Sequence, residues 1–349
     1  MESLLTYLLE HGGCSIQYRI KREIMNIDSS SIELMNLQEQ ILNKPKVKKV
    51  LDKRQPDGWI GDELHGSRGK ALDSSVSFLL DNGIEKDSVF MKDVVHTVLA
   101  KKEEVPYRTT FKGGDALDIG GRGGNKAVKV GILAELGEEN NFLVQEEIRI
   151  SVCYLRDSLK YETIDDFSLV NKKGTRYYKI DAHFPGSNHM HLLSATQSWR
   201  NDENIEMVKK SITHCFKIMQ EYSKGIMFKS NSHFVGPFNF NWGMWKFNIK
   251  DIEQDSYALV WWLRDLYKLS KIGIINEIPE LKRAYDYLWK LVSSQDIVSK
   301  QNDASLKRFK DILATEESWR KSEKVFCDVM FYGVMILFYA GYDVGKISV

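Results

Sequence analysis

Apolar residues recur along this chain at helical spacing, in stretches that end at or near a glycine. One stretch closes on Leu79-Leu80-Asp81-Asn82-Gly83, and another runs from Val128 to Gly137. Two further copies follow the same pattern, Ala258 to Gly273 and Val334 to Gly341, and a looser copy runs from Met190 to Trp199. These segments are interpreted as apolar on all sides, so each one predicts a helix buried in the interior.

A more amphipathic segment follows most of these apolar stretches. These segments are Val89 to Leu99, Leu143 to Leu155, Ile205 to Met219 and Ile278 to Val292. Repeated pairs of helices are typical of stacked helical hairpins, in which the apolar member lies inside. The sequence therefore predicts an all-α fold, an α/α toroid of about five to six hairpins. An open superhelix is the alternative, and the absence of a solenoid-length repeat favours the closed ring.

The 349 residues are expected to form a single domain. Residues 1–45 are interpreted as an N-terminal helical segment that packs on the ring. Strand signals are few. The segment from Arg176 to Ile180 suits a short β segment, and a tyrosine-rich loop is the alternative.

Charge and composition exclude several classes of partner. Forty-nine Lys and Arg residues balance 48 Asp and Glu residues, so nothing indicates binding to nucleic acid or to an anionic membrane. The most apolar segment, Val329 to Ala340, is about half as long as a membrane span requires. We expect no membrane span and a small molecule as the ligand.

Four widely spaced cysteines form no CxxC pair, which suits a reducing compartment. The first ten residues lack the features of a signal peptide, so a cytoplasmic protein is expected. No Walker, G-x-S-x-G or EF-hand motif is present, and the cofactor is left unknown. In an α/α ring, the loops that lead into the inner helices gather around the mouth of a central cavity. Candidate catalytic and ligand-binding residues are therefore expected in these loops.

The first such loop carries Trp59, Asp62, Glu63 and His65. His65 paired with Asp62 or Glu63 would be able to move protons near neutral pH, and Trp59 would bind the ligand. Alternatively, Trp59 packs between hairpins and His65 only bonds a loop carbonyl.

The second loop, residues 113–126, is rich in glycine and includes Asp118 and Arg122. Arg122 and the free backbone amides suit a carboxylate or phosphate, with Asp118 as an acid–base group. No apolar strand precedes the loop, so it is not a P-loop, and a tight loop or lid is the alternative reading.

The third loop holds Asp181, His183, His189 and His191. These are good ligand types for Zn²⁺ or Fe²⁺, but the spacing matches no metal signature, and no metal is assigned. His183 is a candidate catalytic residue and His189 a candidate ligand-binding residue, with structural or surface roles as the alternative.

The fourth loop, residues 233–247, is strongly aromatic and contains Trp242 and Trp245. Both are candidates to line the cavity by stacking on a ligand. Filling the core of the ring is the alternative.

Three short motifs resemble the terpenoid cyclase/protein prenyltransferase superfamily. Gln55-Pro56-Asp57-Gly58-Trp59 resembles the Q-x-x-D-G-x-W motif of squalene–hopene cyclases, although here the Trp follows the Gly directly. The stretch from Leu8 to Arg19, and Phe184-Pro185 followed by a helix and Asn201-Asp202, resemble an uncharacterised bacterial branch of that superfamily. The resemblance implies the α/α toroid.

The chemistry of that superfamily does not carry over. The D-x-D-D and D-D-x-x-D motifs are absent, and Cys327-Asp328 has the wrong order for the zinc site of prenyltransferases. The leading hypothesis is a cyclase- or transferase-like enzyme that uses acid–base chemistry on a small ligand in an aromatic-lined cavity. A carbohydrate-active lyase or hydrolase, and a non-catalytic binding or scaffold protein, are the alternatives.

Overall fold

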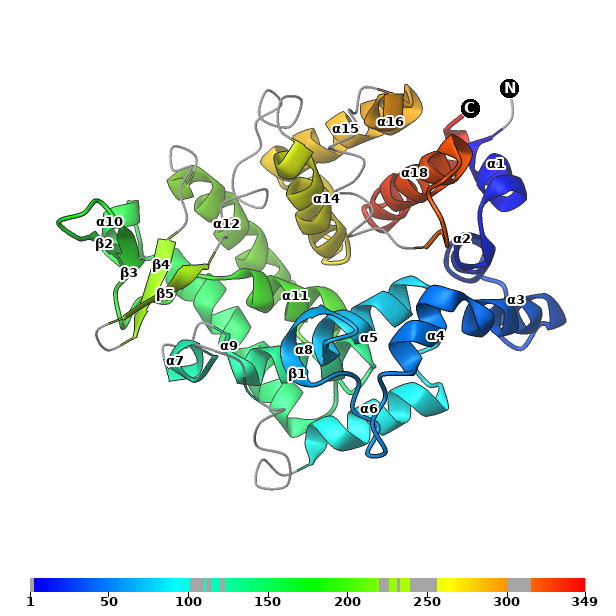
Figure 1. The fold of residues 1–349 in the computed structure, drawn as a ribbon. Helices are drawn as coiled ribbons and strands as arrows, with labels where there is room; N and C mark the ends of the chain where they lie inside the picture. Colours follow the sequence, from blue (N-terminus) through cyan, green and yellow to red (C-terminus); the bar gives the residue numbers. More distant parts are fainter. Residues whose placement is uncertain are drawn as a thin grey trace.

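The structure is a computed structural model, and it describes residues 3–100, 110, 114–119, 123–219, 226–230, 233–238, 256–299 and 315–348. Helices dominate these residues (Figure 1). The α-helices are α1 (Leu4–His11), α2 (Cys14–Arg19), α3 (Ile32–Asn43), α4 (Pro45–Leu51), α5 (Leu72–Asp81), α6 (Val89–Leu99), α7 (Gly114–Ile119), α8 (Asn125–Glu135), α9 (Phe142–Ser158), α10 (Ile164–Phe167), α11 (Ser187–Ala195), α12 (Asp202–Met219), α14 (Ser256–Ser270), α15 (Pro279–Ser293), α16 (Asp296–Ser299) and α18 (Ser322–Tyr339). The π-helical turn η1 (Ile20–Ile24) extends α2, and η2 (Ile275–Glu277) and η3 (Val344–Lys346) are 3₁₀ turns.

The predicted helix ends at glycine are confirmed. Gly83 has a φ of 90°, a conformation that residues with a Cβ rarely adopt, and its N–H donates to the Leu80 carbonyl at 2.8 Å. The glycines at positions 137, 273 and 341 also have positive φ and bond back to the third preceding residue. The same glycine turn therefore ends four of the five helices that the sequence predicts to be buried.

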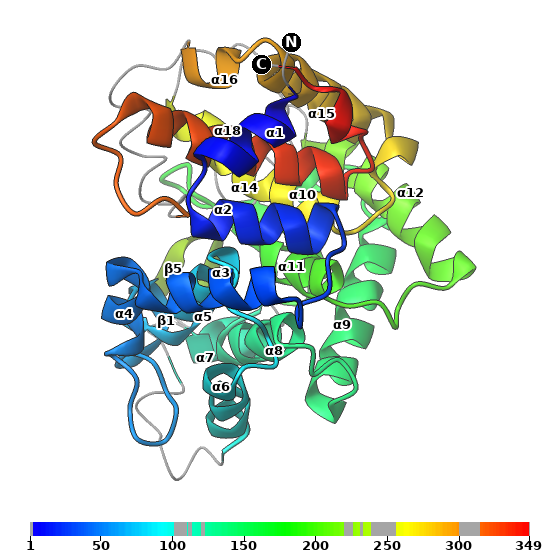
Figure 2. The same cartoon turned by 90° about the vertical axis from the view of Figure 1, so that its right-hand side faces the viewer.

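The helices that the sequence predicts to be buried contact one another in succession. Helix α5 contacts α8, α8 contacts α11, α11 contacts α14, and α14 contacts α18. Helix α18 in turn contacts α2, which lies beside it in Figure 2. Hydrogen bonds link α2 back to the C-terminal end of α5, from Ser15 Oγ to Asn82 Oδ1 and from Arg19 to the Asp81 carbonyl. We call α2 with η1, α5, α8, α11, α14 and α18 the inner helices.

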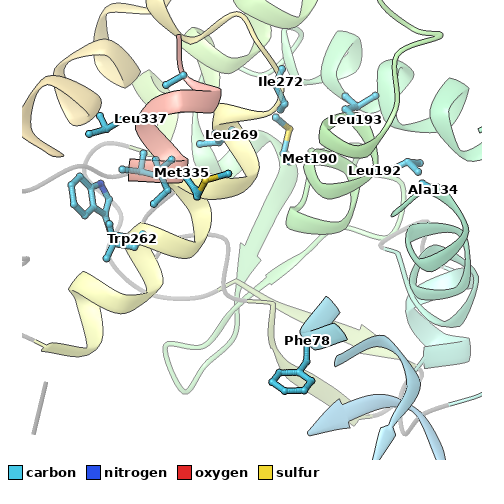
Figure 3. Close-up of a cluster of buried hydrophobic side chains, with 14 of the residues drawn as sticks. Phe78, Ala134, Met190, Leu192, Leu193, Trp262, Leu269, Ile272, Met335 and Leu337 are labelled. Atoms are coloured by element: carbon cyan, nitrogen blue, oxygen red, sulfur yellow. The ribbon is translucent and has the colours of Figure 1, made fainter. Parts of the chain in front are cut away.

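Apolar side chains join neighbouring inner helices. Figure 3 shows Met190 of α11 and Ile272, directly after α14, pointing toward one another. In the same view, Trp262 and Leu269 of α14 lie beside Met335 of α18. All five side chains are almost fully buried, so their removal from water holds the helices together.

The amphipathic helices α6, α9, α12 and α15 pack outside this inner group. Helix α9 contacts α8, α11 and α12, α6 contacts α8, and α15 contacts α18 and α12. In α15, the buried residues Leu281, Ala284, Tyr285 and Leu288 recur every three or four positions. This spacing places them on one face, as the sequence pattern predicts.

A small sheet joins two distant parts of the chain. Its order is β2 (Ser168–Val170), β3 (Arg176–Tyr178), β4 (Ile226–Ser230) and β5 (His233–Phe238). β2 and β3 are antiparallel, β3 and β4 are parallel through Tyr177 and Met227, and β4 and β5 are antiparallel. The expected β segment at 176–180 is confirmed as β3. In contrast, β5 begins the segment 233–247, which the sequence interpretation treats as a loop.

The two ends of the described chain meet. Ser3 and Ser348 form an antiparallel bridge, and the Leu4 N–H donates to the Ile347 carbonyl at 2.8 Å. Helix α1 contacts α18, so the N-terminal helices pack on the C-terminal inner helix. Among the described residues, no helix has both the length and the apolarity needed to cross a membrane.

Candidate active site

Polar side chains from all the inner helices converge on a common centre. Each of these side chains forms a hydrogen bond with, or interacts electrostatically with, other members of the set. We call them the central polar cluster: Arg19, Glu23, Asp73, Ser77, Asp81, Glu135, His191, Arg264, Tyr267, Lys268, Lys271, Tyr332 and Tyr339. The expectation that the inner helices are apolar on all sides is therefore wrong. Helices α5 and α14 each present several polar residues to the centre, whereas α8 and α11 contribute one each, Glu135 and His191.

Helical spacing explains why these residues share a face. On α5, Asp73, Ser77 and Asp81 are four residues apart and lie one above another. On α14, Arg264 and Lys268 are also four residues apart, and Lys271 follows in the turn after the helix. The remaining faces of α14 are packed with buried leucines, so the charged stripe is left to face the centre.

Glu135 and His191 form an acid–base pair within the cluster. Glu135 Oε1 of α8 lies 3.4 Å from His191 Nε2 of α11, and Ser77 Oγ donates to Glu135 Oε2 at 3.3 Å. Burial, helped by the charge of Asp81, raises the Glu135 pKa to about 7 against the pull of Lys271 and Lys268. The carboxyl therefore divides between its acid and carboxylate forms near neutral pH.

His191 stays neutral across the same range. Burial, and then the positive charges of Lys268, Lys271 and Arg264, lower its pKa to about 3. A neutral imidazole can donate one hydrogen bond and accept another, so His191 can orient Glu135 without neutralising it.

Three side chains at the centre are only partly covered. Burial raises the Asp81 pKa. Nevertheless, 43% of the Asp81 side chain, 24% of His191 and 21% of Glu135 stay accessible. These groups therefore present polar surface that a small ligand can contact.

A tight network closes one side of the cluster. Arg19 is buried, and its Nε donates to Glu23 Oε1 at 2.6 Å. Arg19 Nη2 donates to the hydroxyls of Tyr267 and Tyr339 at 3.1 and 3.2 Å, and Tyr339 also donates to Glu23. Lys271 lies 4.4 Å from the centre of the Tyr267 ring. These groups satisfy one another, which is the condition for burying charge at acceptable cost.

His65 lies on another side of the cluster, where its side chain is 53% accessible. It belongs to β1 (Glu63–Arg68), which packs on α5, and its Nδ1 lies 2.5 Å from Asp73 Oδ2. The hydrogen bond to Asp73 raises the His65 pKa, whereas burial and the charges of Lys268 and Arg264 lower it. The positive charges of Lys268 and Arg264 also lower the pKa of His191. The sequence-predicted His65 therefore lies next to the central polar cluster.

The other residues predicted in the first loop lie elsewhere. Asp62 is exposed, and its backbone N–H donates to the Lys70 carbonyl at 2.8 Å. Trp59 is fully buried in the hydrophobic core, and its backbone N–H bonds to Asp57 Oδ1. The partner of His65 is Asp73 rather than the predicted Asp62 or Glu63.

Asp118 lines a separate pocket of about 260 Å³, together with Asp115, Asn125, Lys126 and Lys129. Its carboxylate accepts the backbone N–H of Lys126 at 3.1 Å and so caps the start of α8. Burial raises the Asp118 pKa. Asp118 thus stabilises the inner helix that carries Glu135.

The three histidines of the third loop, His183, His189 and His191, contact three different groups. His183 Nδ1 lies 2.6 Å from Asp157 Oδ2, and its ring packs on Tyr154. His189 is buried and accepts the Gly186 N–H at 2.8 Å, whereas His191 reaches Glu135. Nowhere in the described part of the chain do three His, Cys, Asp or Glu side chains gather to hold a metal ion. Arg122, Trp242 and Trp245 lie outside the described residues.

Sequence reasoning missed Glu135, His191 as an acid–base partner, and the α14 cations. A signal was present, because a lone carboxylate in Gly131-Ile132-Leu133-Ala134-Glu135-Leu136 interrupts a helix that is otherwise expected to be buried. Charged residues are rarely placed in such helices without a partner or a function.

The chain was compared with protein-family models, with curated proteins and with solved structures, and none of them matches it. A function for this chain is therefore inferred from the geometry of the central polar cluster.

Proposed function

We propose that the protein is an enzyme that transfers a proton to or from a small molecule held between its inner helices. Glu135 is the proton-transfer group, and His191 orients it. As a carboxylate, Glu135 takes a proton from one atom of the ligand, and as an acid it returns that proton to another atom. Charge and protons balance without a further reactant, as in an isomerisation or a cyclisation.

The observation that carries this proposal is the 3.4 Å contact between Glu135 and His191, both of which keep some accessible surface. A carboxyl with a pKa of about 7 is well matched to proton transfer at neutral pH. The tyrosines Tyr267, Tyr332 and Tyr339 give part of the cluster an aromatic character, with Tyr267 and Tyr332 stacked at 5.2 Å.

The proposal includes the architecture of an α/α toroid. The succession of contacts from α5 through α18 and α2 back to α5 supports a closed inner layer, with α6, α9, α12 and α15 outside it. This is the arrangement that the resemblance to the terpenoid cyclase/protein prenyltransferase superfamily implies. We retain that resemblance as a proposal about the fold and do not transfer its chemistry.

A carbohydrate-active site is less well supported. A sugar cleft uses tryptophan faces as platforms, whereas Trp59 and Trp262 are buried in the core. The described part of the cluster is instead built from charged groups and tyrosines.

The test is a turnover screen that compares matched variants. Purified protein is incubated with a deproteinised extract of bacterial cells, and metabolites are followed by mass spectrometry. We expect one compound to be consumed by the wild type and by Glu203→Gln, a control on the exposed surface of α12. Glu135→Gln removes the transferable proton but keeps the shape, and should slow that consumption by about 100-fold.

Two results would count against an enzyme. One is that no compound is consumed. The other is that the wild type and Glu135→Gln consume the same compound at the same rate. A circular dichroism spectrum of Glu135→Gln identical to that of the wild type is the check that loss of turnover does not reflect unfolding.

A further inference from the structure

Lys268 of α14 lies in the central polar cluster and forms no ion pair with a carboxylate of the described residues. Its side chain is partly buried, and burial is the main cause of its lowered pKa. Its neighbours in the cluster do have partners: Arg19 bonds to Glu23, and Lys271 packs on the rings of Tyr267 and Tyr339. An unpaired buried charge is costly: the group either loses its charge through a shift of its pKa or is compensated by an ion of opposite sign.

The groups that face Lys268 come from several elements. Arg264 and Asp265 lie on α14 itself, Glu135 lies on α8, and Asp73 lies on α5. The charge of Lys268 also reaches His65 and His191. Burial and the repulsion of Arg264 lower the Lys268 pKa, and the carboxylates only partly oppose this.

We infer that Lys268 is the anchor of a subsite for a small oxyanion, the carboxylate or phosphate group of the ligand that the central site acts upon. The inference rests on the proposed function and names the class of its ligand. An oxyanion beside Lys268 accepts a charge-assisted hydrogen bond from the ammonium group. Its negative charge also offsets the repulsion between Lys268 and Arg264.

The position of the subsite suits the proposed chemistry. Glu135 interacts electrostatically with Lys268. An anion bound to Lys268 therefore lies near the Glu135–His191 pair. Neutral His191 and protonated Glu135 are both hydrogen-bond donors, and both can contact the anion. The bound negative charge favours the protonated form of Glu135, so binding should take up protons.

The probes are inorganic phosphate and succinate, with chloride as the control anion. Binding is measured by isothermal titration calorimetry at pH 7.5 in two buffers of different ionisation enthalpy. We expect phosphate or succinate to bind with proton uptake, and Lys268→Met to weaken binding by about 10-fold or more. Lys49→Met, on the exposed face of α4, should bind as the wild type does.

The two probes separate the sources of the oxyanion. Binding of phosphate alone assigns a phosphorylated ligand, and binding of succinate alone assigns a carboxylate. The inference is overturned if neither binds more tightly than chloride, or if Lys268→Met and the wild type bind equally well.

A second measurement needs no variant and so does not depend on folding. Acetylation of Lys268 by acetic anhydride, followed by peptide mass spectrometry, should slow when the bound anion is saturating, while acetylation of Lys49 should not. Equal rates with and without the anion would contradict the inference. Calorimetry measures binding and does not require turnover, and Glu135→Gln should still bind the anion. A protein that binds the anion but turns nothing over would contradict only the proton-transfer proposal. A protein that turns over a ligand but binds no anion would contradict only the subsite.

Discussion

His191 of α11 packs directly over Gly131 of α8: a Cβ added at residue 131 would lie 3.2 Å from His191 Cδ2. The glycine therefore lets the imidazole approach α8 closely enough to meet Glu135, one turn further along the same helix. Such a contact is tighter than ordinary packing, so the ring would have to move by a few tenths of an ångström to admit a methyl group.

Gly131→Ala should consequently impair function more than stability. Alanine in a helix interior gains about 1 kcal/mol over glycine, which offsets the cost of the close contact. The displaced imidazole no longer orients Glu135, so turnover of the compound found in the extract screen should fall by about 10-fold or more. Urea denaturation and turnover are measured together, with Gly345→Ala in η3 as the control. Equal turnover of the two variants would contradict this role of His191.

Glu135 should make the stability of the protein depend on pH. Its pKa is about 7 in the folded protein and about 4.5 in an ordinary solvated carboxyl. Between these values the folded state binds more protons than the unfolded state, so the free energy of unfolding falls as the pH rises. The contribution of this group that is present at pH 4.5 and lost above pH 7 is about 1–3 kcal/mol.

Urea denaturation between pH 5 and 8 tests this dependence. Glu135→Gln should flatten the decline in the free energy of unfolding, and the exposed control Glu203→Gln should retain it. A slope that is the same in Glu135→Gln and in the wild type would show that Glu135 ionises normally in the folded protein.

The His65–Asp73 contact predicts which carboxylate controls the histidine. Because the hydrogen bond to Asp73 is the main cause of the raised His65 pKa, Asp73→Asn should lower that pKa. Asp62→Asn is the matched control, since Asp62 is exposed and its backbone bonds to Lys70. NMR titration of the His65 ring protons distinguishes the two. If the His65 pKa falls in Asp62→Asn but not in Asp73→Asn, the partner of His65 would be Asp62, as the sequence suggested.

The Arg19–Glu23 pair should be far more important for stability than a surface pair. Burial favours the neutral acid, yet Arg19 and the Tyr339 hydroxyl lower the Glu23 pKa and keep it ionised. Glu23→Gln leaves the buried guanidinium of Arg19 undercompensated and should cost about 2–4 kcal/mol. Glu33→Gln breaks an exposed pair with Lys21 and should cost less than about 1 kcal/mol. Similar costs in thermal unfolding would mean that the buried network is not specifically stabilising.

The sequence predicted the helices well because their signals are local. Apolar spacing marks where α5, α8, α11, α14 and α18 lie, and glycines mark where most of them end. The sequence also singled out His65, because a histidine beside acidic residues in a polar turn is a visible combination, and the structure places it beside the central polar cluster.

The centre of the site was not predicted, for a physical reason. Asp73, Ser77 and Asp81 fall on one face of α5, but a face turned to water shows the same spacing. Only the packing of α8 on α5, of α11 on α8 and of α14 on α11 decides that this face meets Glu135 and Lys268. The contacts between inner helices join residues far apart in the sequence, and no local pattern records them.

The central claim is that Glu135, His191 and Lys268 share one site, and the titration of Glu135 tests it most directly. The side-chain carboxyl is followed by NMR with ¹³C-labelled glutamate, assigned through Glu135→Gln. The account predicts a pKa of about 7, which rises further in Lys268→Met because a neighbouring positive charge is removed. A pKa near 4.5 that is unchanged in Lys268→Met would contradict it.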